Sequence, residues 1–78
     1  MIRLEKAYML ISCEIGEEQS LYSQLKEIPE IKNCLITFGS YDVVAEFVTS
    51  SPQINEIITS KIRKLKNIRS TITLHVTN

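Results

Sequence analysis

The feature that most constrains the fold is a strand–helix–strand pattern that occurs twice within 78 residues. Apolar periodicity predicts strands over 6–14, 31–38, 42–49 and 70–77, and helices over 17–27 and from Pro52 to about Asn67. Two right-handed units of this kind with short connections interleave into a four-stranded antiparallel sheet with both helices on one face. The sequence therefore predicts one α+β domain over residues 1–78, with the ferredoxin-like βαββαβ arrangement.

The ends of the two helices are marked by residues that start or stop helices. Pro29 stops the first helix, because the residue before a proline avoids the α region. Ser51 suits the N-cap of the second helix and Pro52 its first position. A capping box from Ser50 to Gln53 is the alternative register. The apolar residues at helical spacing, which predict the buried faces, are Leu21, Tyr22, Leu25 and Ile28 in the first helix, and Ile54, Ile57, Ile58, Ile62 and Leu65 in the second.

Most strands are apolar on both faces, although the two helices cover only one face of the predicted sheet. In the third strand, Val43, Ala45 and Phe47 oppose Val44, Glu46 and Val48. Monomers seldom expose an apolar patch of this kind, and a chain this short buries only about 60–65% of its unfolded surface. We therefore expect self-association, most simply a two-fold dimer. The sequence leaves open whether the open faces stack or the sheet edges pair.

The last strand separates apolar from polar residues most cleanly. Ile72, Leu74 and Val76 share one face, and Thr71, Thr73, His75 and Thr77 share the other. His75 is the only histidine and lacks a second zinc ligand or a nucleophile at a useful spacing. We therefore expect it on the sheet surface or in a dimer interface. Glu46, a lone carboxylate on a strand, either pairs with a cation across an interface or lies at the exposed margin of the sheet.

Composition excludes several classes of function. Nine basic and nine acidic residues give zero net charge, so there is no basic excess for binding nucleic acid. No signal peptide or membrane-length apolar run is visible, which predicts a cytoplasmic chain. Cys13 and Cys34 fit no metal spacing, and in a reducing cytosol we expect small buried thiols rather than a disulfide. No paired carboxylates, phosphate loop or catalytic triad is present, so we expect neither an enzyme nor a bound cofactor or metal.

The turn Phe38-Gly39-Ser40-Tyr41-Asp42 joins the two central apolar runs. A hairpin turn accounts for the glycine and the aspartate, but it does not require the adjoining tyrosine. If this turn met Thr71 and Thr73, directly or across a subunit boundary, the groups would complement one another. Asp42 would hold an ammonium group, the turn amides a carboxylate, and the hydroxyls would complete the set. These are the groups that an α-amino acid requires.

Several segments together resemble the effector-binding domain of Lrp/AsnC-type transcriptional regulators, also called the RAM domain. They are Ala7-Tyr8-Met9-Leu10-Ile11, Leu25-x-x-Ile28-Pro29-Glu30-Ile31, Phe38-Gly39-Ser40-Tyr41-Asp42-Val43-Val44, Ile62-x-x-Leu65 through Ile68, and Ser70-Thr71-Ile72-Thr73-Leu74. The resemblance extends from about residue 5 to 77. Its most specific part is the glycine-x-Tyr-Asp turn, followed by the proline after the first helix.

The resemblance implies a module that dimerises through its sheet and assembles into octameric or similar rings. In that family, small effectors, commonly amino acids, bind at contacts between dimers. This nominates Gly39, Ser40, Tyr41 and Asp42 as ligand-binding residues, together with Thr71 and Thr73. The chain begins close to the first strand, so it resembles the stand-alone form, which lacks the helix-turn-helix of full-length regulators.

The leading hypothesis is therefore an oligomeric, amino-acid-sensing module that modulates transcription by associating with full-length relatives. A ligand-free interaction module is the main alternative, and a small ferredoxin-like enzyme is a further one.

Overall fold

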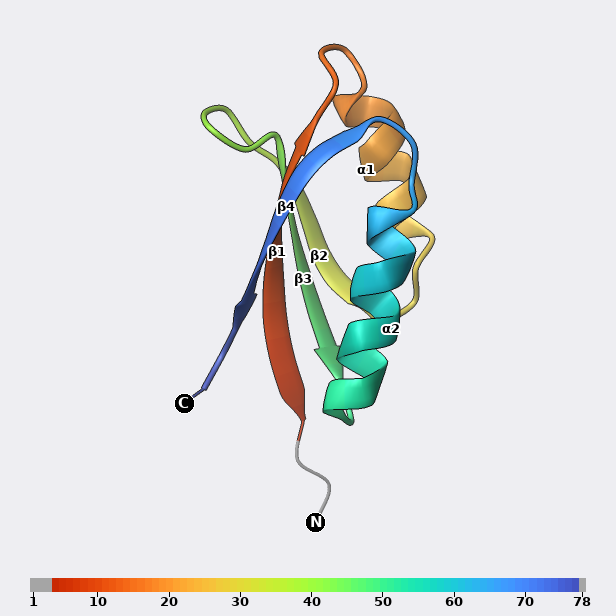
Figure 1. The fold of residues 1–78 in the computed structure, drawn as a ribbon, viewed down its shortest axis with the longest axis vertical. Helices are drawn as coiled ribbons and strands as arrows, with labels where there is room; N and C mark the ends of the chain where they lie inside the picture. The colour runs from red at the N-terminus through yellow and green to blue at the C-terminus, as the bar shows by residue number, and fades with distance from the viewer. Residues whose placement is uncertain (1–3, 78) are drawn as a thin grey trace.

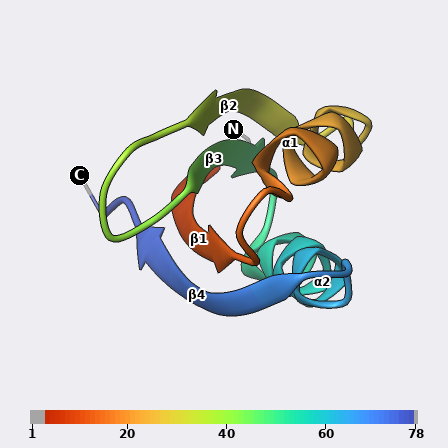
Figure 2. The ribbon, with the colours of Figure 1, turned by 90° about the horizontal axis from the view of Figure 1, so that it is seen from above.

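A computed structural model describes residues 4–77 and confirms the predicted order of elements (Figure 1). The elements are β1 (Glu5–Cys13), α1 (Glu18–Lys26), β2 (Ile31–Ile36), β3 (Val43–Thr49), α2 (Pro52–Arg63) and β4 (Ile68–His75). The strands form one antiparallel sheet in the order β2-β3-β1-β4. Both helices lie on the same face of this curved sheet (Figure 2), which is the ferredoxin-like arrangement.

The end of α2 differs from the prediction, whereas its start agrees with the first of the two registers. The Ser51 hydroxyl accepts a hydrogen bond from the Ile54 N–H at 3.3 Å, which makes Ser51 rather than Ser50 the N-cap. The helix ends at Arg63, before the predicted Asn67. Asn67 has a φ of 70°, and its carbonyl accepts a hydrogen bond from the Glu14 N–H at 2.8 Å. The chain therefore reverses there to enter β4.

The second strand is also shorter than predicted. It ends at Ile36, whose pairing partner in β3 is Val43. The Thr37 N–H then donates to the Asp42 carbonyl at 2.8 Å, which closes the connection between the strands. Phe38, expected on the strand, lies in the turn instead and is fully exposed.

The core lies between the sheet and the two helices. The largest side chains that solvent does not reach are Phe47, Met9, Ile11, Leu21, Leu25, Ile62 and Val43. The predicted buried face of α2 is wrong at Ile57, which is 64% exposed. Ile58 and Ile62 are four residues apart and occupy the centre of that face, so the position before Ile58 points away from it.

A β-bulge in β4 determines which side chains of this strand face the helices. Ile68 pairs with Cys13, whereas Ser70 pairs with Ser12, which leaves Arg69 as an extra residue. The extra residue reverses the alternation of side chains after it. Ile68 therefore packs against the core, while the later apolar residues of β4 point to the open face.

The open face of the sheet carries the exposed apolar residues that the two-faced strands predict. Leu35 is 60% exposed, Ile72 42% and Leu74 49%. The register places Ile72 opposite Leu10, and Leu35 opposite Val44, so these side chains share one surface. This surface spans all four strands and is the one that a second copy of the chain is expected to cover.

Glu46 lies on the same open face and pairs with a cation of its own chain. Its carboxylate is 2.8 Å from the Lys6 Nζ and accepts hydrogen bonds from Asn33 Nδ2 at 2.6 Å and from the Tyr8 hydroxyl at 3.2 Å. The bonds from Lys6 and Asn33 hold the pKa of Glu46 below its ordinary value. The bond with Glu46 in turn raises the pKa of Lys6. The polar cluster thus connects β1, β2 and β3.

Both cysteines carry free thiols, as predicted. Cys13 is buried and Cys34 is half-buried, and burial raises the pKa of each thiol. The two side chains therefore act as small apolar groups of the interior.

Candidate functional site

The turn between β2 and β3 is anchored to the end of β1 by Asp42. Its N–H donates to the Ile11 carbonyl at 2.9 Å, and its carboxylate accepts a hydrogen bond from the Cys13 N–H at 2.9 Å. Inside the turn, the Thr37 hydroxyl donates to the Tyr41 carbonyl at 2.7 Å. Gly39 has a φ of 148°, a conformation that favours glycine. The tip of the turn projects away from the helices (Figure 1).

A hollow of about 510 Å³ lies between this turn and the start of α1. Its lining residues are Glu18, Gln19, Ile36, Thr37, Phe38, Gly39 and Asp42. Two of the four predicted turn residues, Gly39 and Asp42, therefore border one space. Ser40 is exposed and Tyr41 half-buried, and neither lines the hollow. The lining of this space combines the side chains of Asp42 and Glu18 with the apolar side chains of Ile36 and Phe38.

The two threonines predicted to belong to the site lie two strands away. Val43, which follows Asp42, pairs with Ile11 of β1, and Ile11 pairs with Thr71 of β4. Strand β1 therefore lies between the turn and Thr71, and two strand spacings amount to about 10 Å. Thr73 lines a different cleft, between β4 and α2. Within a single chain, the turn and the threonines therefore do not share a cavity.

The cleft between α2 and β4 has a volume of about 370 Å³ and is polar. Its lining residues are Asn55, Glu56, Thr59, Ser60, Arg63, Thr73 and His75. The polar side of α2 was not predicted from the sequence, where only the apolar face of this helix was considered. The available signal was the spacing of Asn55, Thr59 and Arg63, which places polar groups on one side of the helix every four residues. This polar stripe faces the polar row of β4.

The hydrogen bonds near the cleft leave one hydroxyl unpaired. Arg63 Nε donates to the Thr71 hydroxyl at 3.2 Å, and the Thr49 hydroxyl bonds the Asn55 side-chain oxygen. Thr73 Oγ1 is buried and has no hydrogen-bond partner among residues 4–77. A buried polar atom without a partner is unusual and needs an explanation.

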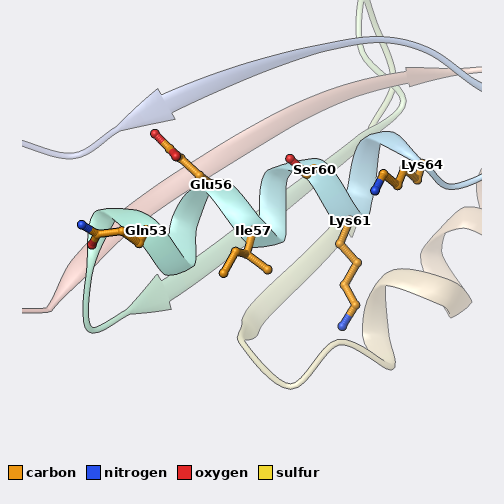
Figure 3. Close-up of a pocket in the computed structure, with 6 residues that line it drawn as sticks. All are labelled: Gln53, Glu56, Ile57, Ser60, Lys61 and Lys64. Carbon is orange, nitrogen blue, oxygen red and sulfur yellow. The ribbon is translucent and has the colours of Figure 1, made fainter.

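A larger hollow of about 650 Å³ lies on the outer side of α2 (Figure 3). Its lining residues come from this helix and its C-cap, Lys64: Gln53, Glu56, Ile57, Ser60, Lys61 and Lys64. In Figure 3, Ile57 and Lys61 point away from the side of the helix that carries Glu56. None of the predicted site residues borders this hollow.

Two further classes of site have no counterpart in the described part of the chain. No three side chains of His, Cys, Asp or Glu within residues 4–77 are grouped to hold a metal ion. In the same range, neither helix has the length and apolar character needed to span a bilayer.

Comparison with known proteins identifies the family. The family model for the Lrp/AsnC ligand binding domain matches residues 6–78. The chain belongs to this family. No match was found among curated protein sequences.

Solved structures show the same fold over nearly the whole chain. The structure of FFRP-DM1 is 28% identical, covers 94% of this chain and 99% of its own, and superimposes with a TM-score of 0.86. The hypothetical protein PHS023 from Pyrococcus horikoshii is 28% identical, with coverages of 95% and 90% and a TM-score of 0.85.

A longer regulator matches over half its length. The feast or famine regulatory protein from M. tuberculosis, solved with L-methionine, is 21% identical, with coverages of 95% and 50% and a TM-score of 0.80. The first two proteins are therefore similar in length to this chain. In the third, the matching part is about half of the protein.

Proposed function

We propose that this chain is an amino-acid-sensing module that modulates transcription by associating with full-length Lrp/AsnC-type regulators. The observation that carries the proposal is the geometry of the β2–β3 turn, where Asp42 and Gly39 border a hollow. Family membership makes a ligand-sensing role the first expectation, and an L-methionine complex of a regulator with the same fold indicates the class of ligand.

The arrangement of charges supports an α-amino acid as the ligand. One oxygen of the Asp42 carboxylate bonds the Cys13 N–H, and the Cys13 thiol lies close to the same carboxylate. We expect the other oxygen to bind an ammonium group. We expect the backbone N–H of Gly39, which borders the hollow, to bind the carboxylate. The apolar ring of Phe38 borders the same hollow and suits an aliphatic side chain.

The separation between the turn and the threonines supports a site that is completed by a second chain. Thr71 and Thr73 lie on the far side of β1 from the turn and line no part of its hollow. In our proposal, the turn of one subunit meets the threonine end of β4 from another. Ligand binding would then stabilise the assembly by mass action, and mixed assembly with longer regulators would carry the signal to transcription.

The test is a thermal-shift screen of the twenty amino acids against wild type and Asp42→Asn. The amide retains an acceptor for the Cys13 N–H, so this variant removes the charge without removing the anchor of the turn. At a ligand concentration of about 100 Kd, binding adds about 2.7 kcal/mol to stability. We expect one or a few amino acids to raise the wild-type Tm by several degrees and to have no effect on Asp42→Asn.

Glu27→Gln, a carboxylate-to-amide change at the exposed C-cap of α1, is the matched control and should respond like wild type. The proposal fails if no amino acid shifts the wild-type Tm, or if Asp42→Asn responds equally. A ligand-free interaction module would give the first of these results. Native mass spectrometry with and without the responding amino acid then shows whether the ligand changes the number of subunits.

A further inference from the structure

The cleft between α2 and β4 differs from the rest of the sheet–helix interface because polar side chains line it from both sides. On α2 they include Asn55, Thr59 and Arg63, and on β4 they include Thr73 and His75. Asn55 is buried at the bottom of this cleft, whereas Arg63 and His75 are exposed, so the cleft opens to solvent. The volume of about 370 Å³ lies within the range of small-molecule sites.

Opposite charges lie at the two ends of this cleft. Arg63 lies beside Thr71, and its Nε–H is already bonded to that hydroxyl at 3.2 Å. This bond orients the guanidinium group and leaves its two terminal nitrogens without a hydrogen-bond partner among residues 4–77. Such a planar pair of donors matches a carboxylate.

Glu56 supplies the negative charge at the other end. It precedes Arg63 by seven residues, which separates the two Cα atoms by about 10 Å along the helix. Glu56 lies on the side of α2 that faces β4 (Figure 3) and lines the same cleft as His75. No ion pair of Glu56 occurs within residues 4–77.

Thr73 lines the cleft, and its hydroxyl is buried without a hydrogen-bond partner among residues 4–77. Rotation about its Cα–Cβ bond exchanges the positions of hydroxyl and methyl among the staggered rotamers. The hydroxyl therefore has a route to a ligand placed between Arg63 and Glu56.

From these observations we propose that the α2–β4 cleft is a second small-molecule site, which binds its ligand through Arg63 and Glu56 and uses no residue of the β2–β3 turn. It takes a linear molecule with a carboxylate at one end and an ammonium at the other, such as an ω-amino acid or the extended form of a basic amino acid. Arg63 binds the carboxylate and Glu56 the ammonium. The two charges of a short α-amino acid share one carbon and are too close together to reach both side chains.

The probe is 5-aminopentanoate, titrated calorimetrically into the full chain at neutral pH. Pentanoate and pentylamine each lack one of its charges and should bind at least about tenfold more weakly, as expected for loss of one charged hydrogen bond. Arg63→Gln and Glu56→Gln should each lower the affinity for 5-aminopentanoate by a similar factor. Lys64→Gln removes a neighbouring positive charge outside the cleft and should leave the affinity unchanged.

A double variant, Glu56→Arg with Arg63→Glu, exchanges the two charges. It distinguishes loss of binding from damage to the fold, because a folded double variant still has both charges. A linear molecule can bind in the reverse direction, so the double variant should recover most of the affinity that Arg63→Glu alone removes. Asp42→Asn should bind 5-aminopentanoate like wild type, which separates this site from the turn. Absence of 5-aminopentanoate binding to wild type, or full affinity in Arg63→Gln, would overturn the proposal without affecting the proposed role of Asp42.

Discussion

Thr73 carries a buried hydroxyl that has no hydrogen-bond partner among residues 4–77. Leaving a buried polar group unpaired costs about 1–3 kcal/mol, whereas an apolar group of the same shape carries no such cost. Functional residues often lower the stability of the folded protein. The unpaired hydroxyl therefore makes Thr73 a candidate functional residue.

We therefore predict that Thr73→Val raises the thermal stability of the ligand-free chain. Valine replaces the hydroxyl with a methyl of nearly the same size, and in a domain of 60–100 residues about 1 kcal/mol corresponds to roughly 4–8 °C in Tm. Differential scanning calorimetry at fixed protein concentration measures the change. Thr77→Val, at an exposed position, is the control. A Tm for Thr73→Val at or below that of wild type would mean that the hydroxyl has a partner after all.

At the scale of the elements, the cluster around Glu46 connects three strands on the open face. Lys6 and Asn33 bond its carboxylate and hold its pKa below the ordinary value of 4.5. A carboxylate with a lowered folded-state pKa adds stability at pH values above its unfolded pKa and loses it as the pH falls through the folded value. The cluster therefore stabilises the sheet at neutral pH and ceases to do so in acid.

The corresponding prediction concerns Glu46→Gln. Its Tm should lie below that of wild type at neutral pH, and the two values should converge as the pH falls below the ordinary glutamate pKa of 4.5 and through the lowered folded-state value. Because the Lys6 side chain is 44% exposed, added salt should also reduce the difference. Circular dichroism melts across this pH range provide the measurement, with Glu27→Gln as a control outside the cluster. A constant difference at every pH would exclude the ion pair as its cause.

At the scale of the whole molecule, the open face of the sheet carries one apolar row that crosses all four strands and continues along β4. Leu35, Ile72 and Leu74 are each more than 40% exposed there, with Leu10 and Val44 between them. Covering this surface with a second copy would remove apolar area from water, at roughly 25 cal/mol per Å². Stacking of the open faces is therefore the mode of self-association that the exposed residues favour.

We expect Ile72→Glu to dissociate the assembly, because a charge would be buried without a partner in the stacked faces. Ile57→Glu is a matched control, since Ile57 is also exposed but lies on α2. Sedimentation velocity should give a monomer for Ile72→Glu and the wild-type assembly for Ile57→Glu. An unchanged assembly in Ile72→Glu, or a monomeric wild type, would show that the sheet faces do not stack.

Much of the fold was predictable because it depends on local patterns. Two-residue and 3.6-residue periodicity gave the order of elements, and Ser51 and Pro52 marked the start of α2 correctly. Errors occurred at the ends of elements: β2 ends at Ile36 rather than Phe38, α2 ends at Arg63 rather than near Asn67, and β4 begins at Ile68 rather than Ser70. The bulge at Arg69 lets β4 begin earlier with Ile68 in the core, and no local pattern indicates such an extra residue.

The candidate site divides in the same way. By itself, the sequence determined the ferredoxin-like order, the two-faced strands and the unusual turn ending in Asp42, because each depends on residues that are neighbours along the chain. Only the tertiary structure decided that Asp42 anchors the turn to Cys13, that Thr73 faces α2, and that Arg63 and Glu56 border one cleft with β4. Those relations depend on strand register and on helix packing across long sequence separations, where a shift of one residue reverses the direction of a side chain.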